Sequence, residues 1–246
     1  MCQTASLKGK VAIITGASSG IGTAIARRLA SDGCAVVVSA RRAERLNALA
    51  SGLTAAGGRA LAVPADVSDA QQMQALADRT VAEFGRIDIM VNNAGFGYIK
   101  PFMESTLAEI NSQIDVNFKG VCFGSMAVLP TMDKQQSGTI INIGSIASIR
   151  HWSHLAVYAA AKHAVLGFSR SLYEEVRTKG IRVSVICPAA VNTEFLDVAG
   201  LTNPPWPAAD MIQSEDVAEL VMTCINMPKN VSLDTMVLWP TCQSSQ

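Results

Sequence analysis

A glycine-rich segment near the start of the chain has the residue types and spacing of a phosphate-binding loop. Glycines at positions 16, 20 and 22 follow the apolar run Val11–Thr15. Gly16 allows a tight turn, Gly20 lets the backbone approach a pyrophosphate, and Gly22 permits close packing of a helix on a strand. The free N–H groups at the start of that helix would face the anion. Because a strand precedes the glycines and a helix follows them, the segment predicts a dinucleotide site.

Two arginines stand where the second predicted strand ends, at the place where a dinucleotide site reads the adenosine ribose. An acidic residue there binds the ribose hydroxyls, whereas a nearby arginine accommodates a 2′-phosphate. This chain has Ala40, Arg41 and Arg42 at that point and no acid. Because a guanidinium group suits a phosphate well, the sequence favours NADP(H) over NAD(H). The alternative is that both arginines are surface charges at a helix start.

These residues need a scaffold, and the apolar pattern indicates which one. Seven short runs, rich in β-branched residues and without polar alternation, are typical of strands covered on both faces. Segments of helix length separate them, which predicts an α/β fold: one Rossmann-type domain, residues 1–246, with a doubly wound, seven-stranded parallel sheet and helices on both faces. The predicted strands are Val11–Thr15, Ala35–Ser39, Ala60–Val63, Ile87–Val91, Thr139–Ile143, Arg182–Ile186 and Thr235–Trp239.

Two long helices and one irregular stretch complete the expected organisation. The helices run from Leu107 to about Met132 and from Leu155 to about Lys179. The irregular stretch, about 191–214, holds three prolines around Trp206. It follows the sixth strand, at the edge where ligands of open α/β sheets bind, so we interpret it as a substrate lid. A disordered connection is the alternative.

Composition excludes several classes of partner. The 246 residues include 20 Lys and Arg and 20 Asp and Glu, a formal net charge of zero, so the broad basic surface that nucleic acid requires is not expected. No window approaches the roughly 18 apolar residues of a membrane span, and no targeting segment is expected at the polar N-terminus. The six cysteines and three histidines lack metal-ligand spacing, which favours reduced thiols, a cytoplasmic protein and no metal.

Four further motifs follow the glycine-rich segment in a recognisable order. They are Asp66-Val67 after the third strand, Asn92-Asn93-Ala94-Gly95 after the fourth, Ser145 after the fifth, and Tyr158-Ala-Ala-Ala-Lys162. Together, from about Lys8 to about Pro240, they resemble the classical short-chain dehydrogenase/reductase family. The arginine pair and the ending near Trp239-Pro240 resemble its NADP-dependent hydroxy acid dehydrogenase and carbonyl reductase branch.

The resemblance implies a catalytic set of Ser145, Tyr158, Lys162 and Asn117. Tyr158 and Lys162 are four residues apart, so they share one helix face. A free phenol has a pKa of about 10, and a nearby ammonium group lowers it. Tyr158 would then act as general acid and base, Ser145 would position the substrate oxygen, and Asn117 would hold a water that relays protons from Lys162 to solvent.

The resemblance also implies where cofactor and substrate bind. The cofactor-binding residues would be Gly16, Ser18, Ser19, Gly20, Ile21, Gly22, Arg41, Arg42, Asp66, Val67, Asn93, Ala94, Gly95, Tyr158, Lys162, Pro188, Val191 and Thr193. The substrate pocket would include Phe96, Tyr98, Ile146, His151, Trp152 and Trp206, with Arg150, His154 and Asn192 as further polar candidates. One departure is Ala189, where the family usually has glycine, because a Cβ resists the positive φ that glycine allows.

These expectations predict an NADP(H)-dependent oxidoreductase that interconverts a secondary alcohol (or hydroxy acid) and a ketone or aldehyde by hydride transfer. The alternatives are an NAD-dependent alcohol dehydrogenase of the same family and a cofactor-binding regulatory protein without turnover. The resemblance further implies a homotetramer (or homodimer) in which the two long helices bury Val121, Met126 and Leu166 against a second copy.

Overall fold

All seven predicted strands form one parallel sheet. The computed structural model describes residues 6–201 and 203–243. The strands lie in the order β3-β2-β1-β4-β5-β6-β7. Strands β2 and β3 are added on one side of β1 and strands β4 to β7 on the other, so the strand order reverses between β1 and β4. The expected boundaries are confirmed to within two residues for every strand. The bounds are β1 Val11–Thr15, β2 Ala35–Ser39, β3 Arg59–Ala62, β4 Ile89–Asn92, β5 Gly138–Ile143, β6 Ile181–Pro188 and β7 Thr235–Leu238.

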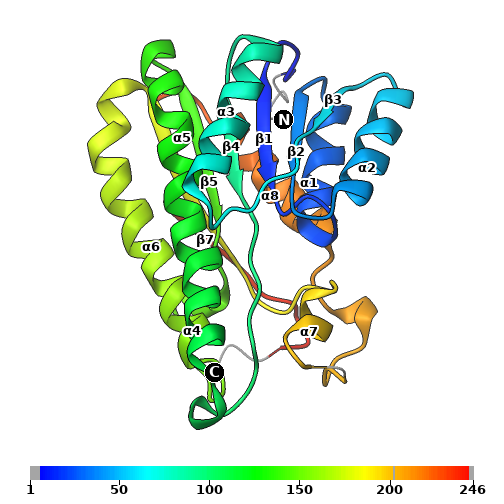
Figure 1. Ribbon diagram of the computed structural model, residues 1–246, viewed down its shortest axis with the longest axis vertical. Helices are drawn as coiled ribbons and strands as arrows, with labels where there is room; N and C mark the ends of the chain where they lie inside the picture. Colours follow the sequence, from blue (N-terminus) through cyan, green and yellow to red (C-terminus); the bar gives the residue numbers. More distant parts are fainter. Residues whose placement is uncertain (1–5, 202, 244–246) are drawn as a thin grey trace.

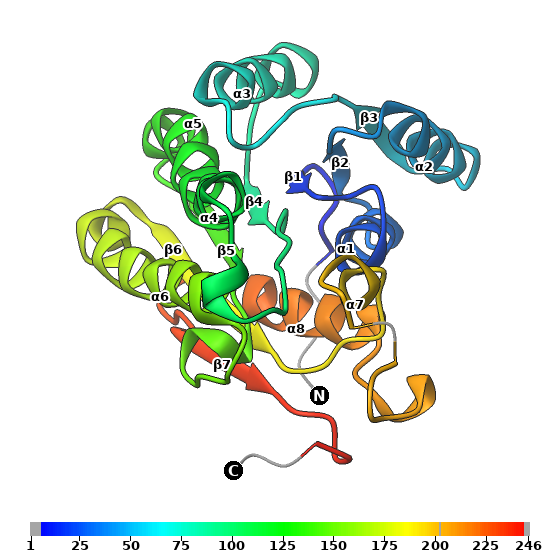
Figure 2. The same cartoon turned by 60° about the horizontal axis from the view of Figure 1, so that its bottom comes forward.

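Helices cover both faces of this sheet (Figures 1 and 2). One face carries α1 (Gly20–Ser31), α2 (Ala43–Ala55) and α8 (Ser214–Asn226), whose buried side chains form one hydrophobic core with the strands. The other carries α3 (Ala70–Phe84), α5 (Gly120–Gln135) and α6 (Ala156–Val176), which bury a second core. The structure is therefore the doubly wound Rossmann-type fold that the strand and helix pattern predicts.

Local sequence sets the ends of these helices, as α3 illustrates. The Asp69 side chain accepts hydrogen bonds from the backbone N–H groups of Gln71 and Gln72, and Gly85 ends the helix in the left-handed region with φ 76°. Both features are standard helix-capping chemistry. Asp69 and Gly85 therefore set the start and the end of α3.

The first of the two long helices is confirmed, and it contains one π-helical turn that the sequence did not predict. It divides into α4 (Leu107–Ile114), one π-helical turn η2 (Asp115–Lys119) and α5, which continues past Met132 to Gln135. A π turn takes one extra residue into the helix, and no local residue pattern marks where this happens. The turn carries Asn117, whose side chain is fully buried.

The stretch 191–214 is a closed loop with its own short elements. A parallel bridge pairs Val191 with Ile212, and the Asn192 N–H donates to the Ile212 carbonyl at 2.9 Å. Between these ends lie α7 (Phe195–Val198) and the 3₁₀ turn η5 (Ala208–Asp210). The remaining 3₁₀ turns are η1 (Phe102–Glu104), η3 (Ile146–Ser148) and η4 (Arg177–Lys179).

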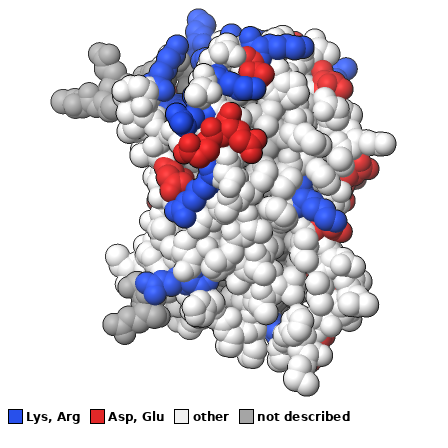
Figure 3. Space-filling model, turned by 90° about the vertical axis from the view of Figure 1, so that its left-hand side faces the viewer, with Lys and Arg blue, Asp and Glu red and all other residues white. Residues whose placement is uncertain are grey.

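The side chains that were expected to contact a second copy are mostly buried within the chain itself. Val121 is 2% exposed and Leu166 is 8% exposed, because both pack inward, whereas Met126 is 57% exposed. The expectation is thus wrong for the first two residues. Figure 3 views the side of the molecule that carries α6 and shows a broad uncharged area, with charges gathered toward one end.

Two findings concern membrane-spanning helices and the state of the cysteines. Among the described residues, no helix is both long enough and apolar enough to cross a membrane. The five cysteines in this part of the chain are free thiols, and Cys34, Cys187 and Cys224 are buried; Cys2 lies outside the described residues.

Candidate active site

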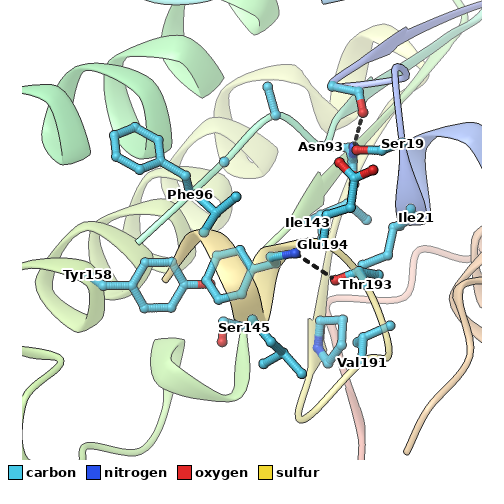
Figure 4. Close-up of a pocket in the computed structure, with 18 of the residues that line it drawn as sticks. Ser19, Ile21, Asn93, Phe96, Ile143, Ser145, Tyr158, Val191, Thr193 and Glu194 are labelled. Carbon is cyan, nitrogen blue, oxygen red and sulfur yellow. Dashed lines mark hydrogen bonds between the residues drawn. The ribbon is translucent and has the colours of Figure 1, made fainter. Parts of the chain in front are cut away.

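A cavity of about 590 Å³ opens at the carboxyl ends of the strands, where the strand order reverses between β1 and β4. This is the place where open α/β sheets bind ligands. Every predicted cofactor-binding residue except Gly22 lines the cavity, together with Ser145 from the predicted catalytic set. Figure 4 shows Tyr158, Ser145 and Phe96 toward one side of it and Ser19, Asn93 and Glu194 toward the other.

The glycine-rich loop adopts the backbone that its glycines allow. Gly16 and Gly20 have φ values of 65° and 50°, in the region that favours glycine. A Cβ on Gly22 would lie 2.5 Å from the Gly16 carbonyl oxygen, so Gly22 acts through close packing and not by lining the cavity. Ser19 precedes α1 in an extended conformation and makes no side-chain capping bond. The first N–H groups of α1 therefore have no side-chain acceptor and face the cavity as an anion site.

Asn93 secures this loop to the sheet. Its Nδ2 donates to the carbonyl oxygens of Thr15 at 2.9 Å and Gly16 at 3.3 Å, while its backbone N–H donates to the Thr15 hydroxyl at 3.0 Å. Asn93 also lines the cavity. It therefore braces β4 against the end of β1 and contributes to the cavity wall at the same time.

Arg42 is held against the loop by a partner that sequence reasoning missed. Its guanidinium group donates to the hydroxyls of Ser18 at 3.0 Å and Ser19 at 2.7 Å, and to Glu194 at 3.0 Å. Arg45 donates to the same carboxylate at 2.8 Å, and the two arginines hold the pKa of Glu194 below its usual value. Glu194 lies about 150 residues from both arginines in sequence, and no local motif marks it, so only the fold reveals the contact.

The catalytic candidates converge at the other side of the cavity. Ser145 precedes η3 after β5, with its hydroxyl accepting a hydrogen bond from the Ala147 N–H. Tyr158 and Lys162 lie on one face of α6, with the Lys162 ammonium 5.8 Å from the centre of the Tyr158 ring. Lys162 is buried and donates to the Ile143 carbonyl oxygen at 2.9 Å. The three residues meet because η3 and α6 both flank the carboxyl end of β5.

Asn117 lies behind this group and does not line the cavity. Its Nδ2 donates to the carbonyl oxygens of Phe96 at 2.7 Å and Gln113 at 2.8 Å, and its Oδ1 accepts from the Phe96 N–H at 3.2 Å. These bonds occupy the amide, which braces the segment after β4 against the π turn. A Cβ on Gly95 would lie 2.7 Å from Asn117 Oδ1 and 3.3 Å from Lys162 Nζ. The water relay expected of Asn117 stays a prediction.

The electrostatics of Tyr158 differ from the expectation. Burial raises the pKa of Tyr158 to about 12, and the Ser145 hydroxyl opposes this effect only in part. Burial also lowers the pKa of Lys162 to about 8. The predicted lowering of the Tyr158 pKa is therefore wrong for the groups that the chain itself provides, because burial disfavours the phenolate more than the Ser145 hydroxyl stabilises it. At neutral pH Tyr158 is protonated, which suits a proton donor.

The Lys162 shift predicts a pH-dependent stability. Its pKa is about 8 in the folded chain and about 10.4 in an unfolded one. Between these values the unfolded chain binds more protons, so stability rises with pH. Relative to Lys162→Met, the free energy of unfolding of the wild type should increase from about pH 8 to about pH 10, by up to ~1.4 kcal/mol per pH unit. Urea denaturation across this range measures the difference. Lys134→Met, at an exposed position on α5, is the control, and the difference in free energy of unfolding between wild type and this variant should not change with pH. A difference that does not change with pH for Lys162→Met would contradict the burial of the Lys162 ammonium.

The substrate side of the cavity agrees only in part with the sequence expectation. Phe96, Ile146, Trp152 and Trp206 line it as predicted, but Tyr98 and His151 do not. The Tyr98 ring packs edge-on against Phe96, with ring centres 5.5 Å apart, and stands behind it. His151 is exposed, because the turn after η3 directs the chain outward at that point. The loop 191–214, interpreted from the sequence as a lid, contributes Glu194, Phe195, Leu196 and Val198 to the lining, and lining residues that the sequence did not indicate include Ile99, Leu155 and Gln243.

Ala189 is accommodated without strain. Among the described residues, the non-glycine positions with positive φ are Gln136 and His154, so Ala189 adopts an ordinary backbone conformation. Its N–H donates to the Leu238 carbonyl at 2.9 Å, which continues the pairing of β6 with β7. Alanine at position 189 is therefore compatible with the path of the chain beside the cavity.

Known proteins resemble this chain along most of its length. The family model of short chain dehydrogenases matches residues 10–202. An uncharacterised oxidoreductase of Methylorubrum extorquens is 40% identical over 85% of this chain and 84% of its own. An alcohol dehydrogenase of Thermococcus sibiricus, solved with 5-hydroxy-NADP, has a TM-score of 0.88 and 32% identity over 96% of this chain and 99% of its own. A metagenomic short-chain oxidoreductase, solved with NADP, has a TM-score of 0.84 and 34% identity over the same shares.

Proposed function

We propose, because the chain belongs to the short-chain dehydrogenase/reductase family and is an oxidoreductase, that it uses NADP(H) to interconvert a ketone or aldehyde and a secondary alcohol. One observation carries the proposal. Ser145, Tyr158 and Lys162 meet at one side of a cavity whose other side holds a glycine-rich loop and two arginines. A hydride carrier and a proton donor can therefore act on one carbonyl between them.

The residues present fit a dinucleotide. The α1 N-terminus has no side-chain cap, and Gly16 and Gly20 keep the loop free of side chains where phosphates would approach. The cavity is also long enough to include the ends of β2 and β3, with Arg41 and Asp66, as well as Tyr158. When bound, the nicotinamide supplies or accepts the hydride. The protein supplies the binding groups, the orientation and the proton.

The proton chemistry follows from the state of Tyr158. Since burial raises its pKa to about 12, its hydroxyl is protonated at neutral pH and can donate a proton to the substrate oxygen during reduction. Ser145, beside it, would hold that oxygen in place. The Lys162 ammonium, fixed to the Ile143 carbonyl, adds positive charge behind Tyr158 and stabilises the phenolate that proton donation leaves.

Arg41 supports the preference for NADP(H). It lines the cavity and is exposed, and within residues 6–201 and 203–243 it forms no salt bridge, whereas Arg42 is paired with Glu194. A 2′-phosphate would thus find Arg41 outside any salt bridge, although the Asp66 carboxylate is near enough for Arg41 to lower its pKa. NAD(H) use is the alternative, and it requires that Arg41 contributes nothing to binding.

Substitution of Arg41 tests the cofactor preference. Arg41→Ala is expected to lower kcat/KM for NADPH by about 10- to 100-fold, because a phosphate contact of roughly 1.5–3 kcal/mol is lost, with kcat/KM for NADH changed little. Steady-state kinetics with both cofactors measures the ratio. Arg27→Ala, an exposed arginine on α1 outside the cavity, is the control. An unchanged ratio in Arg41→Ala would remove Arg41 from the cofactor site.

Assembly and location are part of the proposal. We propose a homotetramer (or homodimer) in which the helical side seen in Figure 3 meets a second copy; its broad uncharged area and the 57% exposure of Met126 support this. Light scattering measures the mass directly. The free thiols support a cytoplasmic location, and a small-molecule carbonyl or alcohol is the proposed partner.

A further inference from the structure

The cavity divides into a charged part and an apolar part. Its charged lining residues, within the described part of the chain, are Arg41, Arg42, Asp66, Lys162 and Glu194. Arg42 and Glu194 are paired beside the glycine-rich loop, and Arg41 and Asp66 follow β2 and β3 on the same side. Lys162 is buried, with its ammonium on the Ile143 carbonyl. Four of the five charges therefore lie at the proposed cofactor side.

The surroundings of Tyr158 are apolar. The Phe195 ring lies 5.5 Å from the Tyr158 ring, and Leu155 packs against the same buried cluster. The backbone at Gly97 is so near that a Cβ there would lie 2.8 Å from Tyr158 Cδ2. Further apolar lining comes from Phe96, Ile99, Trp152, Leu196, Val198 and Trp206.

Few polar groups are available there to a substrate. Apart from residues of the glycine-rich loop, Asn93 and Thr193, the uncharged polar lining residues among those described are Ser145, Tyr158 and Gln243. The two hydroxyls serve the reacting oxygen. The Gln243 Oε1 already accepts a hydrogen bond from the Ala190 N–H at 3.1 Å. Among the residues that the structure describes, the one cation at this end of the cavity is Lys162, whose ammonium already donates to the Ile143 carbonyl, so an anionic group on the substrate would find no unpaired cation there.

The side chains that could have bound an anionic substrate point elsewhere. Arg150, His151 and His154 are exposed and do not line the cavity. Asn192 donates its amide to the Gln213 side chain at 3.2 Å. A substrate carboxylate held against the apolar lining would lose part of its hydration without gaining an ion pair, which is unfavourable in an apolar surrounding.

We infer that the substrate is an uncharged ketone with an aryl or cycloalkyl group, and that keto acids and hydroxy acids are excluded. The inference rests on the proposed function and narrows its substrate class, because it excludes the hydroxy acids that the sequence had led us to expect. Aromatic and cyclic groups suit a wall of tryptophan and phenylalanine. Trp152 is 37% exposed and Val198 is 57% exposed, which leaves apolar area for such a group to cover.

A matched pair of ketones that differ in charge tests the inference. Methyl 4-acetylbenzoate and 4-acetylbenzoate carry the same acetyl group, and the carboxylate lies across the ring from the reacting carbonyl. Within a panel of aryl and cycloalkyl ketones followed by NADPH absorbance, kcat/KM for the ester should exceed that for the acid by on the order of 100-fold. Equal values would overturn the inference and leave the proposed function standing. No oxidation of NADPH with any ketone of the panel would overturn the inference, and no oxidation with a matching panel of aldehydes either would overturn the proposed function as well.

A variant with a positive charge added to the apolar part of the cavity tests whether the missing cation excludes acidic substrates. Val198 lies on α7, lines the cavity and is more than half exposed, so Val198→Arg can place a guanidinium there without burying it. This variant should raise kcat/KM for 4-acetylbenzoate by about 10-fold over Val198→Gln, which is polar and uncharged. The ester should be reduced equally by the two variants. No difference between them with the acid would contradict the inference that a missing cation excludes it.

Discussion

Tyr158→Phe is expected to reduce kcat by about 10²- to 10⁴-fold, the range that a positioned proton donor contributes, while NADPH binding persists. The substitution removes one oxygen and keeps the ring that packs against Phe195. Since the Tyr158 hydroxyl is the buried, protonated group next to Ser145, its loss leaves the substrate oxygen without a proton donor. Turnover is measured by NADPH absorbance, and the dissociation constant of NADPH by fluorescence.

Tyr173→Phe is the matched control, because Tyr173 lies on the same helix, α6, outside the cavity. It should leave both kcat and NADPH binding close to wild type. A Tyr158→Phe variant as active as wild type would show that the mechanism is wrong. Wild-type protein that binds NADPH but turns over no carbonyl compound would instead favour the alternative of a regulatory protein without turnover.

Gly22→Ala should have the second largest effect, on both cofactor binding and stability. The new Cβ would lie 2.5 Å from the Gly16 carbonyl oxygen and 2.7 Å from Asn93 Nδ2. The backbone of the glycine-rich loop must then move. This movement disturbs the hydrogen bonds from Asn93, which follows β4, to the Thr15 and Gly16 carbonyl oxygens. Overpacking of this kind costs about 1–3 kcal/mol, and we expect NADPH binding to weaken by about 10-fold or more.

Gly52→Ala makes the same chemical change where nothing lies within 4 Å of the new Cβ. Gly52 is inside α2, so alanine there should raise the free energy of unfolding by about 0.5–1 kcal/mol. Chemical denaturation should give stability changes of opposite sign for the two variants. NADPH titration should show weaker binding for Gly22→Ala and unchanged binding for Gly52→Ala. If Gly22→Ala binds NADPH as tightly as wild type, the packing role assigned to Gly22 is wrong.

Most of the fold could be predicted from the sequence because its signals are local. The strands are uninterrupted apolar runs, buried along their length in β1, β2, β4 and β5, and the α3 boundaries follow from Asp69 and Gly85. The π turn was missed because such turns are rare, and no local residue pattern marks where an α-helix takes up one extra residue. Its effect appears in three dimensions, where Asn117 reaches Phe96.

The candidate site was predictable where family motifs mark it and unpredictable where contacts are long-range. The motif residues around Ser145, Tyr158 and Lys162 line one cavity. Tyr98 and His151 were expected to line it as well, but Tyr98 packs edge-on against the Phe96 ring and His151 is exposed. Glu194 was missed because its partners, Arg42 and Arg45, are distant in sequence.

The sequence by itself determined the architecture, because strand and helix patterns are local, and its motifs led to the proposed phosphate-binding loop and, through the family resemblance, to the catalytic candidates. Only the tertiary structure decided the environment of those residues. It buries Tyr158 and Lys162 deeply enough to move their pKa values to about 12 and about 8. It also places the charges of the cavity mainly on the cofactor side and surrounds Tyr158 with apolar groups. Burial and charge depend on distances between segments far apart in the chain, so a local pattern cannot supply them.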